Sequence, residues 1–174
     1  MKELKEYVRN IPDFPEKGII FRDITTVFQN PEALKLSIDS MQEKLNNVDF
    51  DIVVGAESRG FLFGTPIAYN LNKAFVPVRK KGKLPYETIE ESYNLEYGQA
   101  TLEIHKDAIK PGQRVVIIDD LIATGGTLEA IIKLVERLGG IVVKVCCLID
   151  LPDLGGKEKI KNYDVETVIA FEGK

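Results

Sequence analysis

The chain has 174 residues, of which 44% are hydrophobic and 29% are charged, with a formal net charge of −4. This composition is typical of a soluble globular protein that buries its own core, and we predict a single domain over residues 1–174. The acidic balance argues against nucleic acid as a main partner. No apolar run is long enough to cross a membrane, and the charged start, Met1–Glu6, is unlike a signal peptide. We therefore expect no membrane partner and a cytoplasmic location.

The N-terminal part is predicted to contain two helices with an extended segment between them. Apolar residues recur at helical spacing over residues 4–11, which favours an amphipathic helix that ends before Pro12. Residues 19–25 then form a short extended segment with an Arg-Asp pair among apolar residues. Asn30 and Pro31 form an N-cap and first-turn pair, so a second helix should begin there.

From residue 51 onward, short apolar strands alternate with helical segments. The expected strands are residues 51–55, 74–78, 115–118, 141–149 and 165–171, and the expected helices are residues 61–71 and 127–138. Between them, residues 93–97 and 100–104 alternate like the strands of a hairpin, and the polar stretch 86–92 before it looks like a mobile lid. This alternation predicts an α/β fold with a mostly parallel sheet flanked by helices.

The stretch Val115–Thr127 carries the strongest chemical signal in the chain. Its apolar strand runs into Asp119 and Asp120, and then into the loop Ala123-Thr124-Gly125-Gly126-Thr127 and a helix. The glycines let successive backbone N–H groups converge on one anion at the helix N-terminus. A ribose 5-phosphate fits this pattern. The loop N–H groups and the two threonine hydroxyls would take its phosphate, and the two aspartates would accept from its 2′- and 3′-hydroxyls.

This pattern resembles the ribose-phosphate signature of the type I phosphoribosyltransferases, which bind 5-phosphoribosyl-1-pyrophosphate (PRPP). Other nucleotide motifs fit less well, because no Gly-Lys-Ser/Thr follows a glycine loop and no Gly-x-Gly-x-x-Gly follows the first strand. The resemblance implies the fold of that family, with a small N-terminal hood over about residues 1–30 and a lid hairpin.

A second charged loop follows the strand at residues 51–55. It reads Ala56-Glu57-Ser58-Arg59-Gly60 and should face the first loop across a crevice at the carboxyl ends of parallel strands. One loop would then hold the 5-phosphate and the other the pyrophosphate, with Arg59 as the natural cation. The family resemblance implies a strained peptide at Glu57–Ser58 that turns N–H groups inward, and we hypothesise that it is cis.

Two further stretches resemble adenine phosphoribosyltransferases. In residues 19–23, the resemblance implies that main-chain groups near Ile20 and Arg22 read the edge of adenine, with Phe21 stacked on its ring. The basic cluster at residues 79–83 matches a pattern whose cations neutralise pyrophosphate, some of them across a homodimer interface. The cations so implied are Arg79, Lys80 and Lys83.

The sequence Leu-Glu-Tyr-Gly at residues 95–98 is a further match to the adenine-specific family. The resemblance implies that Glu96 is the acid that protonates the purine ring as N9 attacks, and it places Tyr97 among the substrate-binding residues. A hairpin that carries these residues over the crevice would exclude water from the reaction.

Together these matches imply transfer of the 5-phosphoribosyl group from PRPP to N9 of adenine, giving AMP and pyrophosphate in purine salvage. Mg²⁺ would be carried mainly by the substrate pyrophosphate, since the sequence offers no dedicated carboxylate cage. Two alternatives stay open. One is a phosphoribosyltransferase for hypoxanthine, xanthine or orotate, because main-chain groups can set base choice. The other is a regulator that binds PRPP without catalysis, although such a protein should lack Glu96 or carry an added nucleic-acid-binding segment.

Overall fold

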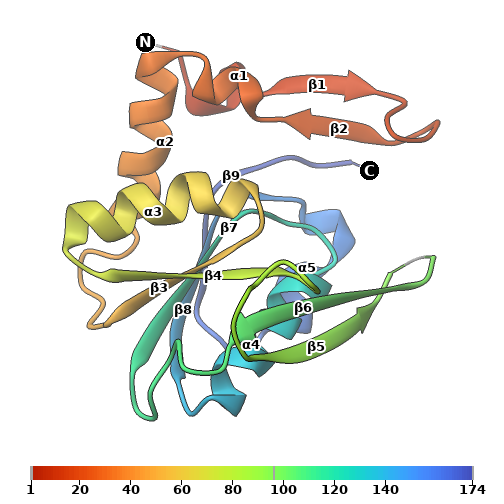
Figure 1. Cartoon of the computed structure of the whole chain (residues 1–174). Coiled ribbons are helices and arrows are strands. Elements are labelled where there is room, and N and C mark those ends of the chain that lie inside the picture. Colours follow the sequence, from red (N-terminus) through yellow and green to blue (C-terminus); the bar gives the residue numbers. More distant parts are fainter. Residues whose placement is uncertain (1, 96, 174) are drawn as a thin grey trace.

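The computed structural model describes residues 2–95 and 97–173. The strands of its main sheet are β3 (Ile52–Ala56), β4 (Ala74–Lys80), β5 (Thr88–Asn94), β6 (Gln99–His105), β7 (Arg114–Ile122), β8 (Ile141–Asp150) and β9 (Val165–Ala170). Their order is β5-β6-β4-β3-β7-β8-β9 (Figure 1). The strands from β4 to β9 in this order are parallel, and β6 is antiparallel to both β4 and β5. The predicted α/β class with a mostly parallel sheet is confirmed.

Helices cover both faces of this sheet (Figure 1). They are α1 (Thr25–Phe28), α2 (Pro31–Glu43), α3 (Arg59–Leu71), α4 (Gly126–Arg137) and α5 (Gly156–Lys159), with the 3₁₀ turns η1 (Leu4–Tyr7) and η2 (Pro152–Leu154). Val115 and Ile117 of β7 belong to the core beneath α4, whereas Val116 and Ile118 belong to the core beneath α2 and α3. Because both of its faces are buried, β7 is a continuous apolar run up to its acidic end.

The acidic pair lies inside this central strand. β7 continues through Asp119 and Asp120 to Ile122 instead of ending at residue 118 as predicted. The helix that follows begins at Gly126, so the connection between strand and helix is short.

Within residues 2–95 and 97–173, no helix combines the length and the apolar character that a membrane span requires.

Within the N-terminal segment predicted to be a hood, β1 (Arg9–Pro12) and β2 (Ile20–Asp23) form a separate antiparallel sheet. From here on, the hood means this two-stranded sheet. Thr25 donates to the Asp23 carboxylate through its hydroxyl and its N–H at 2.7 and 2.9 Å, and Arg9 donates to it at 2.7 Å. The hydrogen bonds from Thr25, followed by that from Arg9, lower the pKa of Asp23 to about 2. Asp23 is therefore ionised, and it links the end of β2 to β1 through Arg9 and to the start of α1 through Thr25.

The amphipathic helix predicted over residues 4–11 is wrong beyond its first turn. Only Leu4–Tyr7 is helical, and Val8 is already extended. Residues 9–12 instead pair with β2, because an isolated helix of two turns is too short to be stable and strand pairing overrides it. Leu4 and Val8 are buried all the same.

The predicted hairpin is confirmed, but its first strand is Thr88–Asn94, so it starts and ends earlier than the predicted residues 93–97. β5 begins at Thr88, opposite His105, and pairs with β6 as far as Asn94, opposite Gln99. Residues 86–92, predicted to be a mobile lid before the hairpin, instead belong to its first strand from Thr88 onward. Half-buried and exposed side chains alternate along β5, but the alternation is hard to see in the sequence because polar residues occupy both sets.

Candidate active site

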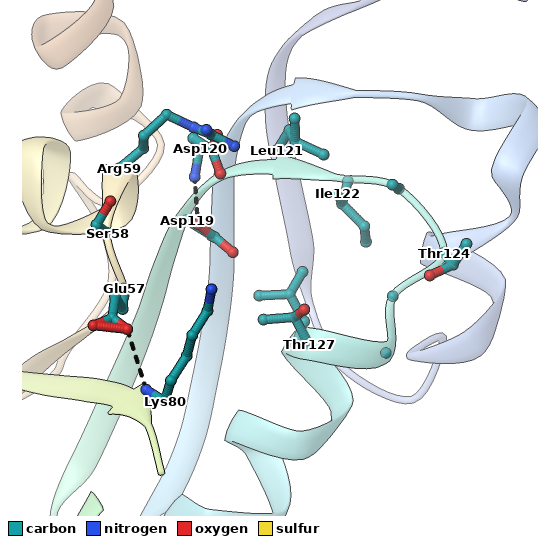
Figure 2. Close-up of a pocket in the computed structure, with 14 residues that line it drawn as sticks. Glu57, Ser58, Arg59, Lys80, Asp119, Asp120, Leu121, Ile122, Thr124 and Thr127 are labelled. Carbon is teal, nitrogen blue, oxygen red and sulfur yellow. Dashed lines mark hydrogen bonds and ion pairs between the residues drawn. The ribbon is translucent and has the colours of Figure 1, made fainter. Parts of the chain in front are cut away.

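A cavity of about 350 Å³ opens at the carboxyl ends of β3 and β7 (Figure 2). Its lining comes from two strand-to-helix loops and from the end of β4, and consists of Glu57, Ser58, Arg59, Lys80 and residues 119–128. The carboxyl edge of a parallel sheet is where open α/β folds bind their ligands. The structure therefore brings the two predicted loops and the acidic pair together in one cavity.

One wall of the cavity is the phosphate loop, residues 123–127, between β7 and α4. Gly125 has a φ of +86°, in the left-handed region that other residues rarely adopt, and it directly precedes the first turn of α4. Figure 2 shows Thr127 in that first turn, facing the end of β7 that bears Asp119. Backbone N–H groups at a helix N-terminus suit an anion, so this geometry matches the predicted phosphate cradle.

Helix α5 lies behind the phosphate loop at a distance that only glycine allows. A Cβ on Gly156 would lie 2.5 Å from the carbonyl oxygen of Ala123, and a Cβ on Gly125 would lie 2.9 Å from the carbonyl oxygen of Gly156. A side chain at either position would collide with backbone atoms, so both residues must be glycine for α5 and the loop to lie this close together. The sequence analysis did not identify Gly156, and the only signal for it was the glycine pair at residues 155–156.

The acidic pair is buried and is compensated from across the cavity. Burial, followed by the negative charge of Asp120, raises the pKa of Asp119 well above its usual value. Asp120 forms an ion pair with Arg59, whose Nε lies 2.5 Å from Oδ2. Burial alone would lower the pKa of Arg59, but the charge of Asp120 and its hydrogen bond outweigh burial and raise that pKa. Arg59 thus joins the second loop to the end of β7.

The second loop contains the hypothesised cis peptide, at Glu57–Ser58. The Glu57 carboxylate accepts hydrogen bonds from Arg79 at 2.9 and 3.0 Å and from the N–H of Lys80 at 3.3 Å. Burial tends to raise the pKa of Glu57, but the hydrogen bonds from Lys80 and Arg79 outweigh it and lower the pKa. Arg79 therefore holds the loop, and Lys80 is the member of the basic cluster that lines the cavity (Figure 2).

Three of the predicted residues in the basic cluster and the hairpin, Arg79, Lys83 and Tyr97, are not among the residues that line this cavity. Lys83 donates its backbone N–H to Glu103 at 3.0 Å in the turn after β4. Tyr97 lies at the tip of the hairpin with 79% of its surface exposed. Glu96 lies outside the residues that the structure describes.

The predicted base-binding residues lie on the hood, beside the cavity and not in its lining. Ile20, Phe21 and Arg22 belong to β2. The Phe21 ring lies 6.0 Å from the guanidinium carbon of Arg59, which brings the hood to the edge of the second loop. The guanidinium carbon of Arg22 lies 4.4 Å from the centre of the Phe171 ring. Because the side chain is engaged there, the main chain of Arg22 is the part that remains available for reading a base.

Comparisons with known proteins bear on this arrangement. The model of the phosphoribosyl transferase domain family matches residues 23–173. The chain is 69% identical over 174 residues to the adenine phosphoribosyltransferase of Lachnoclostridium phytofermentans, and each chain is covered completely. This chain belongs to the adenine phosphoribosyltransferase family. The adenine phosphoribosyltransferase of Agathobacter rectalis is 59% identical, again over the full length of both chains.

Solved structures of adenine phosphoribosyltransferases share the fold. The enzyme from Thermoanaerobacter pseudethanolicus superposes with a TM-score of 0.94 at 53% identity, covering 97% of this chain and 98% of that one. The enzyme from Saccharomyces cerevisiae, in a complex that contains adenine, has a TM-score of 0.89 at 42% identity, covering 95% of this chain and 96% of that one. The type I phosphoribosyltransferase fold implied by the sequence motifs is thereby confirmed.

Proposed function

We propose that the protein transfers the 5-phosphoribosyl group from PRPP to N9 of adenine, forming AMP and releasing pyrophosphate in purine salvage. The observation that carries this proposal is the single cavity in which the phosphate loop, the acidic pair and the second loop meet. The choice of adenine is supported by the family of the chain and by the S. cerevisiae relative, which was solved in complex with adenine.

The phosphate loop accounts for binding of the ribose 5-phosphate. The N–H groups of residues 123–127 and the hydroxyls of Thr124 and Thr127 hold the phosphate at the start of α4. Asp119 and Asp120 lie at the adjoining end of β7, where they accept hydrogen bonds from the 2′- and 3′-hydroxyls. This arrangement fixes the sugar between the loop and the strand and presents its anomeric carbon to the rest of the cavity.

The charges in the cavity match the charges that the reaction develops. As the bond to pyrophosphate breaks, the sugar ring gains oxocarbenium character, as in glycoside chemistry. The negative acidic pair stabilises this positive charge. Arg59 and Lys80 lie opposite and stabilise the negative charge on the departing pyrophosphate, while Arg79 keeps the second loop in place through Glu57.

Magnesium fits this site as a companion of the substrate. Among the described residues, no cluster of three or more acidic, histidine or cysteine side chains is placed to hold a metal ion. Asp119 and Asp120 are adjacent carboxylates in the lining of the cavity, and they would offer oxygen ligands to an ion that arrives with PRPP. When bound, Mg²⁺ would neutralise charge on the pyrophosphate oxygens.

The hood and the hairpin supply the base-binding side. Main-chain groups of Ile20 and Arg22 read the edge of adenine, and the Phe21 ring stacks on it. Glu96 is the acid that protonates the purine ring, and Tyr97 contacts the substrate when the hairpin tip closes over the cavity. The observation that supports this placement is the position of Phe21 beside Arg59 at the rim of the second loop.

We also infer a homodimer. Leu62 and Tyr69 stand two turns apart on the same face of α3 with 51% and 85% of their surfaces exposed, which is typical of a surface that a partner covers. Sedimentation at the mass of one chain would contradict this inference. The cytoplasmic location expected from the sequence stays a prediction.

The reaction itself is tested with a panel of bases. The protein is incubated with PRPP and Mg²⁺ and with adenine, hypoxanthine, guanine, xanthine or orotate, and nucleotide and pyrophosphate are followed by chromatography. We expect AMP from adenine and no product from the other bases. Turnover of another base would overturn the assignment of the hood while keeping the phosphate loop. Tight binding of PRPP without turnover would favour the regulator.

Replacing Asp120 tests the role of the acidic pair. Asp120→Asn removes negative charge from the position that faces the sugar, so kcat/KM should fall at least about thirtyfold, which corresponds to about 2 kcal/mol. Asp39→Asn is the matched control, because Asp39 lies on the exposed face of α2 in an ion pair with Lys35. An unchanged kcat/KM for Asp120→Asn would remove this residue from the site.

Replacing Glu96 tests the proposed acid. Glu96→Gln keeps the shape of the side chain but cannot supply the proton, so kcat should fall by about a hundredfold while PRPP affinity changes little. Glu90→Gln is the control on the same hairpin, because it changes only the side chain of Glu90, which forms a surface ion pair with Lys81, and leaves its backbone carbonyl in place. Equal losses in kcat and in PRPP affinity for Glu96→Gln would indicate a structural role.

A further inference from the structure

Tyr93 connects the hairpin to the phosphate loop without lining the cavity. It lies near the end of β5, and its hydroxyl is 2.9 Å from the Thr127 hydroxyl in the first turn of α4. Its ring covers the loop as well, since a Cβ on Gly126 would lie 3.0 Å from Tyr93 Cδ2. Tyr93 is half-buried and packs against the core beneath α4. It therefore lies against two consecutive residues of the phosphate loop, Gly126 and Thr127, from outside the cavity lining.

The chemistry of the ligand decides the direction of this hydrogen bond. A hydroxyl has one proton to donate, and the oxygens of an ionised phosphate only accept. If the Thr127 hydroxyl is to donate to the 5-phosphate, its oxygen must be the acceptor from Tyr93. The tyrosine hydroxyl thus directs the only proton of Thr127 toward the cavity. A threonine in the first helical turn that lacked this partner would be free to turn its hydroxyl elsewhere.

A second contact keeps Tyr93 in place relative to α4. Arg137, in the last turn of that helix, donates to the carbonyl oxygen of Glu90 at 2.5 Å and to the Glu91 carboxylate at 3.1 Å. β5 is therefore fastened to both ends of α4, by Arg137 at one end and by Tyr93 at the other. Glu96 follows Tyr93 closely in the chain. The contact of Tyr93 with the phosphate loop therefore also fixes the end of β5 from which the hairpin tip begins.

We propose that Tyr93 is a positioning residue for the 5-phosphate site: it orients the hydroxyl of Thr127 toward the phosphate and ties the base of the lid hairpin to the phosphate loop. This inference rests on the proposed function, because it takes the 5-phosphate to be the ligand of residues 123–127. Tyr93 is not among the residues that line the cavity, so its hydroxyl acts on the phosphate through Thr127.

Calorimetric titration of the whole protein with ribose 5-phosphate, and separately with pyrophosphate, tests this proposal without any need for turnover. Tyr93→Phe keeps the ring over Gly126 and removes only the hydroxyl. The affinity for ribose 5-phosphate should fall by about three- to tenfold, the usual effect of one hydrogen bond, while the affinity for pyrophosphate stays unchanged. Tyr163→Phe is the matched control, because the Tyr163 hydroxyl donates to Glu136 at the far end of the same helix. This control should bind both ligands as the parent protein does.

A double-variant cycle separates orientation of Thr127 from general destabilisation. In a Thr127→Val background there is no hydroxyl to orient, so adding Tyr93→Phe should weaken ribose 5-phosphate binding no further. An undiminished loss in that background would overturn the proposal, as would equal losses for ribose 5-phosphate and pyrophosphate. If the parent protein binds ribose 5-phosphate and Tyr93→Phe binds it equally well, only this inference fails. If the parent protein does not bind it, the proposed function of the loop fails as well.

Discussion

Two consecutive carboxylates lie at the end of a strand that is buried on both faces, and their charge must be compensated within the protein. Arg59 provides this compensation from the neighbouring strand-to-helix loop through its ion pair with Asp120. The ion pair joins the loop after β3 to the end of β7, so the two walls of the cavity are held at a fixed separation. The pKa of Asp119 stays raised in spite of Arg59, because burial and the neighbouring charge of Asp120 both disfavour a second negative charge there. A ligand that brings its own positive charge or hydroxyl donors to this position relieves that constraint.

The phosphate loop is held by close packing and by a hydrogen bond between two hydroxyls, neither of which depends on charge. The phosphate loop is confined between α5, through Gly156, and the β5–β6 hairpin, through Tyr93. A loop confined in this way presents its N–H groups in one arrangement before any ligand binds, which lowers the entropic cost of binding. The hood stands apart from this rigid unit, since Asp23 anchors it near α1 and Phe21 reaches only the rim of the second loop. The structure thus combines a closely packed loop, the proposed site of the sugar phosphate, with a proposed base-binding side built from smaller and more separate elements.

Much of this architecture could be predicted from the sequence because its central features are local. The apolar run, the acidic pair and the glycines of residues 115–127 follow one another in the chain, and the α4 helix begins within one residue of its expected start. The N-terminal helix failed because two helical turns are weak against strand pairing. The basic cluster could not be resolved into roles, since only the structure shows that Arg79 binds Glu57 while Lys80 lines the cavity. Gly156 and Tyr93 were missed because they reach the phosphate loop from distant parts of the chain.

The most direct test of the central claim is a crystal structure of the protein in complex with ribose 5-phosphate. The account predicts the phosphate on the N–H groups of residues 123–127, with the hydroxyl of Thr127 donating to it. It also predicts the 2′- and 3′-hydroxyls within hydrogen-bond distance of Asp119 and Asp120. Density for the phosphate at the Glu57–Arg59 loop, or for the sugar on the hood, would contradict this account of the cavity.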